Sequence, residues 1–450
     1  MDAALRRLKE AFVTDHKGTS DTEIALVVSL PLLFTALHQG LHLERVSATH
    51  PWLGFLVDTA TLTLPTLAVI CQPEHNATYA NWAAAVALPL LALRWYQTAP
   101  RTGARAPAAL KGKGAVAHAY AAAAASQAQS FFWNITRGGL QLMTMICILA
   151  VDFPVFPRRF AKTETFGTGL MDVGIGCFVV SSALTSGPYL LGRPSAKTMQ
   201  RVTRGSTIVL FLGLARTLLT KSVNYQEHVS EYGLHWNFFT TLGLVPFVLA
   251  ALRFLVPIHG FAAGIAMTLA HQFCYQNGLE DWVLHAPRQS FVSANKEGIA
   301  SLPGYFALFL LGAHLATTSL RAQPRPLLAL AVFYGTAYRF SLSISGTAVS
   351  RRLANTPYVL WVMATTTVYI AASRLICGAC GASRVPRLFE AINANQLVVF
   401  VVANLLTGLI NLSMDTLRVS DDHAMAILAA YLVVVTGVGY VLHAYRLRIH

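Results

Sequence analysis

Long apolar stretches alternate with short polar connections along almost the whole chain. A stretch of about 20 apolar residues is long enough to cross a bilayer as a helix, and the chain repeats such stretches from near its beginning to near its end. The pattern therefore predicts an all-α polytopic membrane protein with about thirteen transmembrane helices in one bundle. These helices are expected near residues 24–40, 51–72, 79–97, 137–152, 167–190, 206–221, 233–256, 258–275, 301–320, 327–346, 356–376, 393–412 and 423–444.

The composition excludes a soluble domain. Of the 450 residues, 54% are apolar and only 12% are charged, and the mean hydropathy is +0.51. Such values over this length are typical of membrane proteins. We expect a polar, amphipathic N-terminal segment over residues 1–23, a transmembrane domain over 24–445 and a short tail over 446–450. The first segment has no cleavable apolar core, so the first span is expected to serve as the insertion signal.

The basic residues predict the orientation of the chain. The longest polar connection, about residues 98–129, contains Arg101, Arg105, Lys111 and Lys113 without an acid, so we expect it to face the cytosol. Its composition predicts a mobile connector or a loose amphipathic helix. An odd number of spans then places the N-terminus in the lumen and the C-terminus in the cytosol. The net charge of +14 is explained by this topology and by contact with anionic head groups. No motif for reading nucleic acid accompanies it.

Cysteine and histidine spacings give weak signals for metal or redox chemistry. Cys377 and Cys380 form a CxxC pair, but no second pair accompanies it, so packing or lipid attachment is favoured over half a zinc site. His38 and His42 are four residues apart and would share a helix face, yet no third ligand is evident. The sequence therefore predicts no metal site.

The densest cluster of charges in the apolar chain is the run VDFPVFPRRFAKTETFG, residues 151–167. Charges at the edge of the hydrocarbon region are costly and are usually retained for binding or chemistry. Pro154 and Pro157 stop the preceding helix and favour a fixed, extended turn. We therefore expect the active centre here.

Asp152 precedes this turn and Lys162 follows it, so a folded turn would bring carboxylate and ammonium together. A partly desolvated carboxylate is suited to act as a general base on a hydroxyl, and a nearby cation orients it and stabilises an oxyanion. A close ammonium also lowers the basicity of the carboxylate. The alternative is a structural ion-pair knot that clamps the loop, made of Asp152, Arg158, Arg159, Lys162 and Glu164.

Many further polar side chains lie within or beside the predicted spans. Such groups need partners or a wet cavity, so they predict a polar pocket lined by several helices, although each one alone is also explained by a hydrogen bond between helices. A single histidine, His235 or His314, is a further candidate base. The set contains Asp172, Glu231, His235, Trp236, Asn237, Asn295, Glu297, Arg339, Arg351, Arg352, Asn393, Asn395, Gln396, Asn404, Asn411 and Asp415.

The run from Ile148 to Gly169 closely resembles the signature of the glucosaminyl-phosphatidylinositol acyltransferases, which acylate inositol during GPI-anchor synthesis in the endoplasmic reticulum. Further blocks resemble the same family in the same order. They are residues 231–239, 296–305, 393–397 and 404–411. Several polar blocks in order are more specific than any single motif.

The resemblance implies transfer of a long fatty acyl chain, typically palmitoyl, from acyl-CoA to the 2-hydroxyl of inositol in glucosaminyl-phosphatidylinositol. It implies a multi-pass protein of the endoplasmic reticulum membrane, acyl-CoA as co-substrate and no further cofactor. The proposed catalytic Asp and Lys of the family fall on Asp152 and Lys162. Arg158 and Arg159 are expected to bind a phosphate, since arginine forks suit phosphate geometry.

The expected substrate-binding residues come from the signature and from the polar set. The expected partners are palmitoyl-CoA, glucosaminyl-phosphatidylinositol and membrane lipids, and no nucleic acid. Two other classes stay open on the residues alone: a multi-pass lipid or solute transporter with a polar central cavity, and a scaffold for GPI-synthesis enzymes. The expected substrate-binding residues are Arg158, Arg159, Glu164, His235, Asn237, Arg351 and Asn395.

Overall fold

The structure is a computed structural model of the chain. It describes residues 11–12, 14–72, 76–98, 115–222, 229–320, 324–380 and 384–448. The chain folds into two compact units, each built from two segments. Unit 1 comprises Met1–Ile24 and Arg158–Val368, and unit 2 comprises Ala25–Pro157 and Tyr369–His450. Each unit is described separately below.

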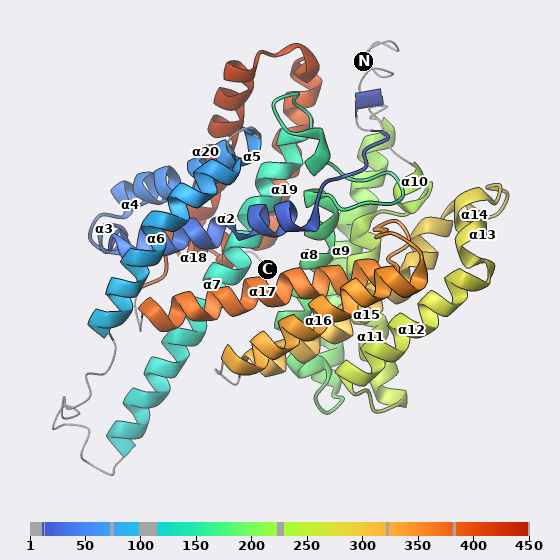
Figure 1. The fold of residues 1–450 in the computed structure, drawn as a ribbon, viewed down its shortest axis with the longest axis horizontal. Helices are drawn as coiled ribbons and strands as arrows, with labels where there is room; N and C mark the ends of the chain where they lie inside the picture. Colours follow the sequence, from blue (N-terminus) through green and yellow to red (C-terminus); the bar gives the residue numbers. More distant parts are fainter. Residues whose placement is uncertain are drawn as a thin grey trace. The chain divides into compact units, whose positions relative to one another are not determined.

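The predicted all-α membrane fold is confirmed. Each of the thirteen predicted windows falls on helical structure (Figure 1). Within the described residues, nine helical segments are long and apolar enough to cross a membrane. They are Asp21–Gly40, Pro51–Cys71, Leu170–Leu190, Phe238–Leu255, Lys296–Thr318, Arg325–Ser345, Thr356–Cys380, Gln396–Ser413 and Asp421–Ala444.

The other four windows fall on helices that do not meet these limits in the described part of the chain. They lie on α6 (Asn76–Thr98), α7 (Ala115–Ala150), α9 (Ala196–Ser222) and α12 (Gly260–Cys274). Helix α12 has 15 residues, fewer than the roughly 20 that a bilayer requires. Basic residues in the first turns of α9, among them Arg201, reduce its hydropathy.

The loop at about residues 98–129, predicted as a mobile connector or a loose amphipathic helix, is described mainly in its second half. Residues 99–114 lie outside the described residues, as do residues 1–10 of the predicted N-terminal segment. From Ala115 onward the chain is helical and continues into α7. Of the two alternatives, this second half takes the helical one, which the run of alanines at 121–125 favours.

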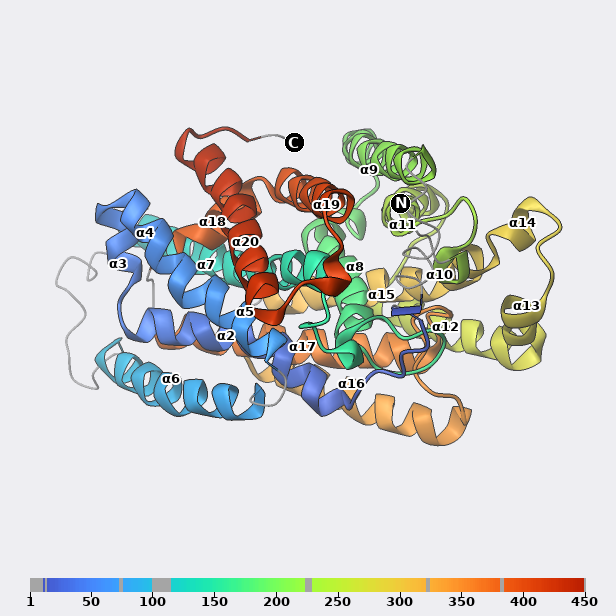
Figure 2. The ribbon, with the colours of Figure 1, turned by 90° about the horizontal axis from the view of Figure 1, so that it is seen from above.

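Unit 1 is built around α15 (Lys296–Leu320), which packs against α8 (Leu170–Leu190) and α12. Helix α9 runs beside α11 (Phe238–Leu255), as both views show (Figures 1 and 2). Small residues allow the close contact between α8 and α15. A Cβ at Gly187 would lie 2.4 Å from the Ala313 Cβ, so this contact requires glycine.

The remaining described elements of unit 1 are five short helical segments, the 22-residue α16 and part of α17. They are η4 (Arg158–Phe160), α10 (Val229–Tyr232), η5 (Tyr275–Leu279), α13 (Glu280–His285), α14 (Phe291–Ala294), α16 (Pro324–Ser345) and the first part of α17 (Thr356–Cys380). Helix α17 continues into unit 2, and α2 (Asp21–Gly40) likewise begins in unit 1 and ends in unit 2.

Unit 2 contains α7, which packs against α18 (Arg387–Ala394), α19 (Gln396–Ser413) and α20 (Asp421–Ala444). Its other elements are α3 (Glu44–Thr49), α4 (Pro51–Asp58), the π-helix η1 (Thr59–Thr63), α5 (Leu64–Cys71), α6 and the 3-10 helix η6 (Thr416–Arg418). His38 and Asp58 are both fully buried, and the His38 Nε2 and Asp58 Oδ1 atoms are 2.8 Å apart. A carboxylate partner thus accounts for His38.

Candidate active site

The charged turn after α7 is anchored by aromatic side chains. Phe153, Phe156 and Phe160 are fully buried, whereas the charged residues between and beside them are partly exposed. The turn also crosses the boundary between the units, so Asp152 belongs to unit 2 and Lys162 to unit 1. The two predicted catalytic groups are therefore described with their partners in their own units.

Asp152 follows the end of α7 and receives a hydrogen bond from an amide. The Nδ2 atom of Asn411, on α19, donates to the Asp152 Oδ2 atom over 2.7 Å and also to the Thr407 carbonyl over 3.1 Å. The backbone contact fixes the amide, and the amide in turn orients the carboxylate.

Lys162 lies beside an acid from α10. Its Nζ atom is 3.0 Å from the carboxylate of Glu231, and the two side chains are 34% and 23% exposed. Glu231 also lies 3.6 Å from Arg351, measured to the Nη2 atom. The Arg351 Nε atom donates to the Asp172 Oδ1 atom over 2.7 Å, where both side chains are buried. Acids and bases thus alternate in a row that runs from buried Asp172 to partly exposed Lys162.

The buried end of this row also fixes the backbone beside Lys162. Asp172 lies in the first turn of α8, where the helix dipole favours a carboxylate. Its Oδ2 atom accepts a hydrogen bond of 3.0 Å from the backbone N–H of Thr163, the residue after Lys162. Asp172 therefore positions Lys162 in two ways, through this backbone contact and through Arg351.

Arg351 remains charged although it is buried. Burial acts against its charge, but the nearby Glu231, Tyr232 and Asp172 outweigh this effect and raise the pKa of Arg351 well above its ordinary value. The guanidinium lies over the Tyr232 ring, 5.8 Å from the centroid. Burial raises the pKa of Tyr232 well above its ordinary value, so this hydroxyl stays neutral. These contacts describe Arg351 as a positioning residue, and its predicted contact with substrate stays a prediction.

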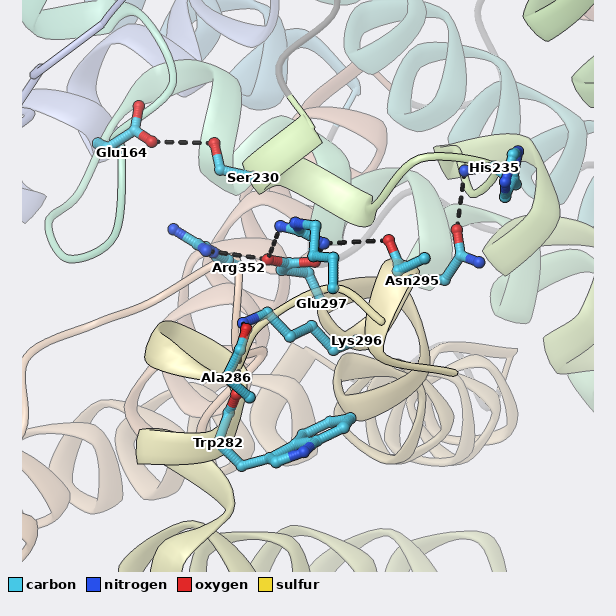
Figure 3. Close-up of polar contacts among 11 residues, drawn as sticks. Glu164, Ser230, His235, Trp282, Ala286, Asn295, Lys296, Glu297 and Arg352 are labelled. Atoms are coloured by element: carbon cyan, nitrogen blue, oxygen red, sulfur yellow. Dashed lines mark hydrogen bonds and ion pairs between the residues drawn. The ribbon is translucent and has the colours of Figure 1, made fainter. Parts of the chain in front are cut away.

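The other charged residues of the turn attach it to the N-terminal part of unit 1 and to α10. Arg158 lies over the ring of Phe12, 4.0 Å from its centroid. Arg159 forms an ion pair of 2.8 Å with Glu23 at the start of α2. Glu164 accepts a hydrogen bond of 2.9 Å from the Ser230 hydroxyl, as Figure 3 shows. The ion pairs of Arg159 and Lys162 thus have partners outside the turn, and the knot among the five charged residues of the turn stays a prediction.

His235 and Asn237 lie on either side of Trp236, just before α11. The backbone N–H of His235 donates to the Asn295 Oδ1 atom over 2.8 Å (Figure 3), and its ring stacks on Phe291. Asn237 caps α11 by accepting from the Thr240 N–H over 3.2 Å. These contacts explain both residues as structural, and their predicted substrate contacts stay predictions.

Asn395 lies in unit 2, between α18 and α19. Its side-chain amide donates to the Leu447 carbonyl over 2.9 Å, and the residue is almost fully buried. A hydrogen bond that holds the chain near the end of α20 accounts for this side chain. As for metals, the described residues hold no group of three His, Cys, Asp or Glu side chains suited to an ion.

Taken together, the helices and the row of alternating charges define a multi-pass membrane protein with a charged centre near helix ends. Comparison with known proteins gives the family. The model of the GWT1 family matches residues 5–442. The chain belongs to this family, and its resemblance to the GPI inositol acyltransferases is confirmed.

Several proteins of similar sequence carry the name GPI-anchored wall transfer protein 1. The protein of Schizosaccharomyces pombe is 41% identical over 340 residues, covering 70% of this chain and 72% of its own length. That of Aspergillus oryzae is 34% identical over 506 residues and covers both chains completely. That of Candida albicans is 31% identical over 481 residues, covering 96% of each. The similarity therefore extends over both units.

Proposed function

We propose that this protein is an O-acyltransferase of GPI-anchor biosynthesis in the endoplasmic reticulum membrane. It transfers a long-chain acyl group, palmitoyl in the typical case, from acyl-CoA to the 2-hydroxyl of inositol in glucosaminyl-phosphatidylinositol. Membership of the family supports this role, and the names of the relatives connect them with GPI-anchored proteins. The observation that carries the proposal is that each of the two functional groups has a partner that orients it. Asp152 accepts a hydrogen bond from Asn411, and Lys162 forms an ion pair with Glu231.

The proposed reaction needs a general base and a group that stabilises negative charge on the thioester oxygen. Asp152 takes the proton of the inositol hydroxyl while the hydroxyl oxygen attacks the carbonyl carbon of the thioester. The ester bond forms, the carbon–sulfur bond breaks, and the CoA thiolate leaves and takes up the proton that Asp152 had accepted. Lys162 stabilises the negative charge that develops on the carbonyl oxygen.

The partners of the two groups support this division of roles. A hydrogen bond from an amide fixes the direction of a carboxylate, which a general base needs in order to meet the hydroxyl of its substrate. Asn411 supplies such an amide to Asp152. The ammonium of Lys162 has a carboxylate partner of its own in Glu231, which holds it in one direction. The proposal assigns Arg158 and Arg159 to a substrate phosphate and places the active site on the lumenal side, with the N-terminus lumenal and the C-terminus cytosolic.

The test is product formation by purified protein in liposomes with labelled palmitoyl-CoA. One acceptor is glucosaminyl-phosphatidylinositol, and a matched acceptor has its inositol 2-hydroxyl methylated. The proposal expects an acylated lipid from the first acceptor and none from the second, with mass spectrometry locating the ester on inositol. Movement of lipid across the bilayer without any acylated product would overturn it in favour of a transporter.

A further inference from the structure

A second charged cluster lies in unit 1, at the start of α15. The fully buried carboxylate of Glu297 receives both arms of the Arg288 guanidinium and one nitrogen of Arg352. Arg288 approaches it from the segment before α14, and Arg352 from the loop before α17. Figure 3 shows Arg352 and Glu297 in contact at this helix end. One acid is therefore shared by two arginines.

Lys296 adds a third positive charge to this cluster. The residue is only 2% exposed, and its ammonium donates to the Ala286 and Trp282 carbonyls at the end of α13, as Figure 3 shows. Carbonyls orient a cation but do not neutralise it. With Glu297 as the one acid in ion-pair contact with the arginines among the described residues, the cluster has a net charge of about +2.

One donor of the cluster has no acceptor. The Nε atom of Arg352 is buried and makes no hydrogen bond to any of the described residues. The Arg352 side chain is 10% exposed. A buried N–H normally finds a partner, and an excess of buried positive charge favours an anion. Arginine forks match the geometry of phosphate in particular.

The surface beside this cluster is apolar. Phe291 is 67% exposed and Val292 is 51% exposed, and both lie on α14, which is outside the segments long and apolar enough to cross a membrane. Leu234, at 40% exposure, precedes His235, whose ring stacks on Phe291. Exposed apolar side chains next to desolvated cations suit an amphiphile with an anionic head group.

We propose that Arg288 and Arg352 bind the phosphate of an anionic membrane phospholipid whose acyl chains lie over Phe291, Val292 and Leu234. The lipid occupies a site of its own in unit 1. The proposal goes beyond the acyl transfer, because this lipid need not be the acyl acceptor.

The test measures lipid binding directly. Purified, delipidated protein in detergent receives dioctanoyl-phosphatidylglycerol, an anionic lipid without inositol, dioctanoyl-phosphatidylcholine or inorganic phosphate, and binding is followed by native mass spectrometry and by thermal unfolding. The variants are Arg352→Gln, which leaves Glu297 its contacts with Arg288, and Phe291→Ser, which changes an exposed side chain. Arg339→Gln is the matched control, since this exposed arginine pairs with Asp21 elsewhere in unit 1.

We expect the anionic lipid to bind the wild type and to raise its unfolding temperature, with weaker binding of the phosphatidylcholine. Arg352→Gln should weaken binding of the anionic lipid by at least about tenfold, the usual loss with one charge-assisted contact. Phe291→Ser should weaken lipid binding and leave phosphate binding unchanged. Equal lipid binding by Arg352→Gln and the wild type would overturn the proposal. So would an equal loss in the Arg339→Gln control, or phosphate binding as tight as that of the lipid.

Discussion

Glu231→Gln separates the positioning of Lys162 from the stability of the fold. The substitution preserves the shape of the side chain and removes the negative charge that lies between Lys162, at 3.0 Å, and Arg351, at 3.6 Å. Arg351 keeps its shorter contact of 2.7 Å with Asp172. The buried guanidinium is therefore not left without a counter-charge, whereas the ammonium of Lys162 loses its carboxylate partner.

The expected loss of stability follows from the exposure of the two side chains, Lys162 and Glu231. Lys162 and Glu231 are 34% and 23% exposed, so loss of this ion pair should cost the fold no more than about 1 kcal/mol. The effect on catalysis should be larger, because displacing a catalytic group by about 1 Å can reduce the rate by about 100-fold. We therefore expect kcat to fall by about 10–100-fold with little change in thermal stability.

The assay combines acyl-transfer kinetics with thermal unfolding of the same preparations in detergent. Glu231→Asp, which keeps the charge on a shorter side chain, should recover part of the lost kcat, which a purely structural role would not predict. The reasoning is refuted if Glu231→Gln retains wild-type kcat while Lys162→Ala abolishes transfer. That result would mean that Lys162 acts without the help of Glu231.

Three further substitutions test the contacts around this centre. Asp172→Asn leaves buried Arg351 poorly compensated, so thermal unfolding should show a loss of about 3–5 kcal/mol. Asn411→Leu removes the donor that orients Asp152, and transfer kinetics should show kcat lower by about tenfold, with partial recovery in Asn411→Gln. Gly233→Ala places a Cβ 2.5 Å from the Asn295 Cα at a φ of +117°; chemical denaturation should show a loss of at least about 1–3 kcal/mol, and wild-type stability would contradict the strain.

The helices could be predicted from the sequence because hydropathy depends on each segment alone. All thirteen apolar windows correspond to helices. The division into two units was not predictable in this way, since a side chain facing lipid and one packed against another helix are equally apolar. The connector near 98–129 shows a related difficulty. Its alanines and glycines left a mobile connector and a loose helix both open, and the helix found from Ala115 onward agrees with the strong helix propensity of the alanine run at 121–125.

The candidate site was predictable as a segment but not as a set of contacts. Asp152 and Lys162 stood out because charges clustered between apolar windows. Their partners in the structure, Asn411 and Glu231, are 259 and 69 residues away, respectively. The sequence contains many other amides and acids within or beside the spans, and it does not indicate which of them would be the partners. Asp172, an acid in an apolar helix, indicated that some cation must pair with it. Only the fold identifies that cation as Arg351, which is 179 residues away.

The most direct test of the account is a double-mutant cycle in the acyl-transfer assay with Asp152→Asn, Lys162→Ala and the combined variant. If both groups serve the same transfer step, each single substitution should reduce kcat by about 10²–10⁴-fold with thermal stability retained. The kcat of the combined variant should then be no lower than that of the less active single variant. Wild-type kcat in either single variant, or losses that multiply in the combined variant, would contradict the assignment of the two residues to one step.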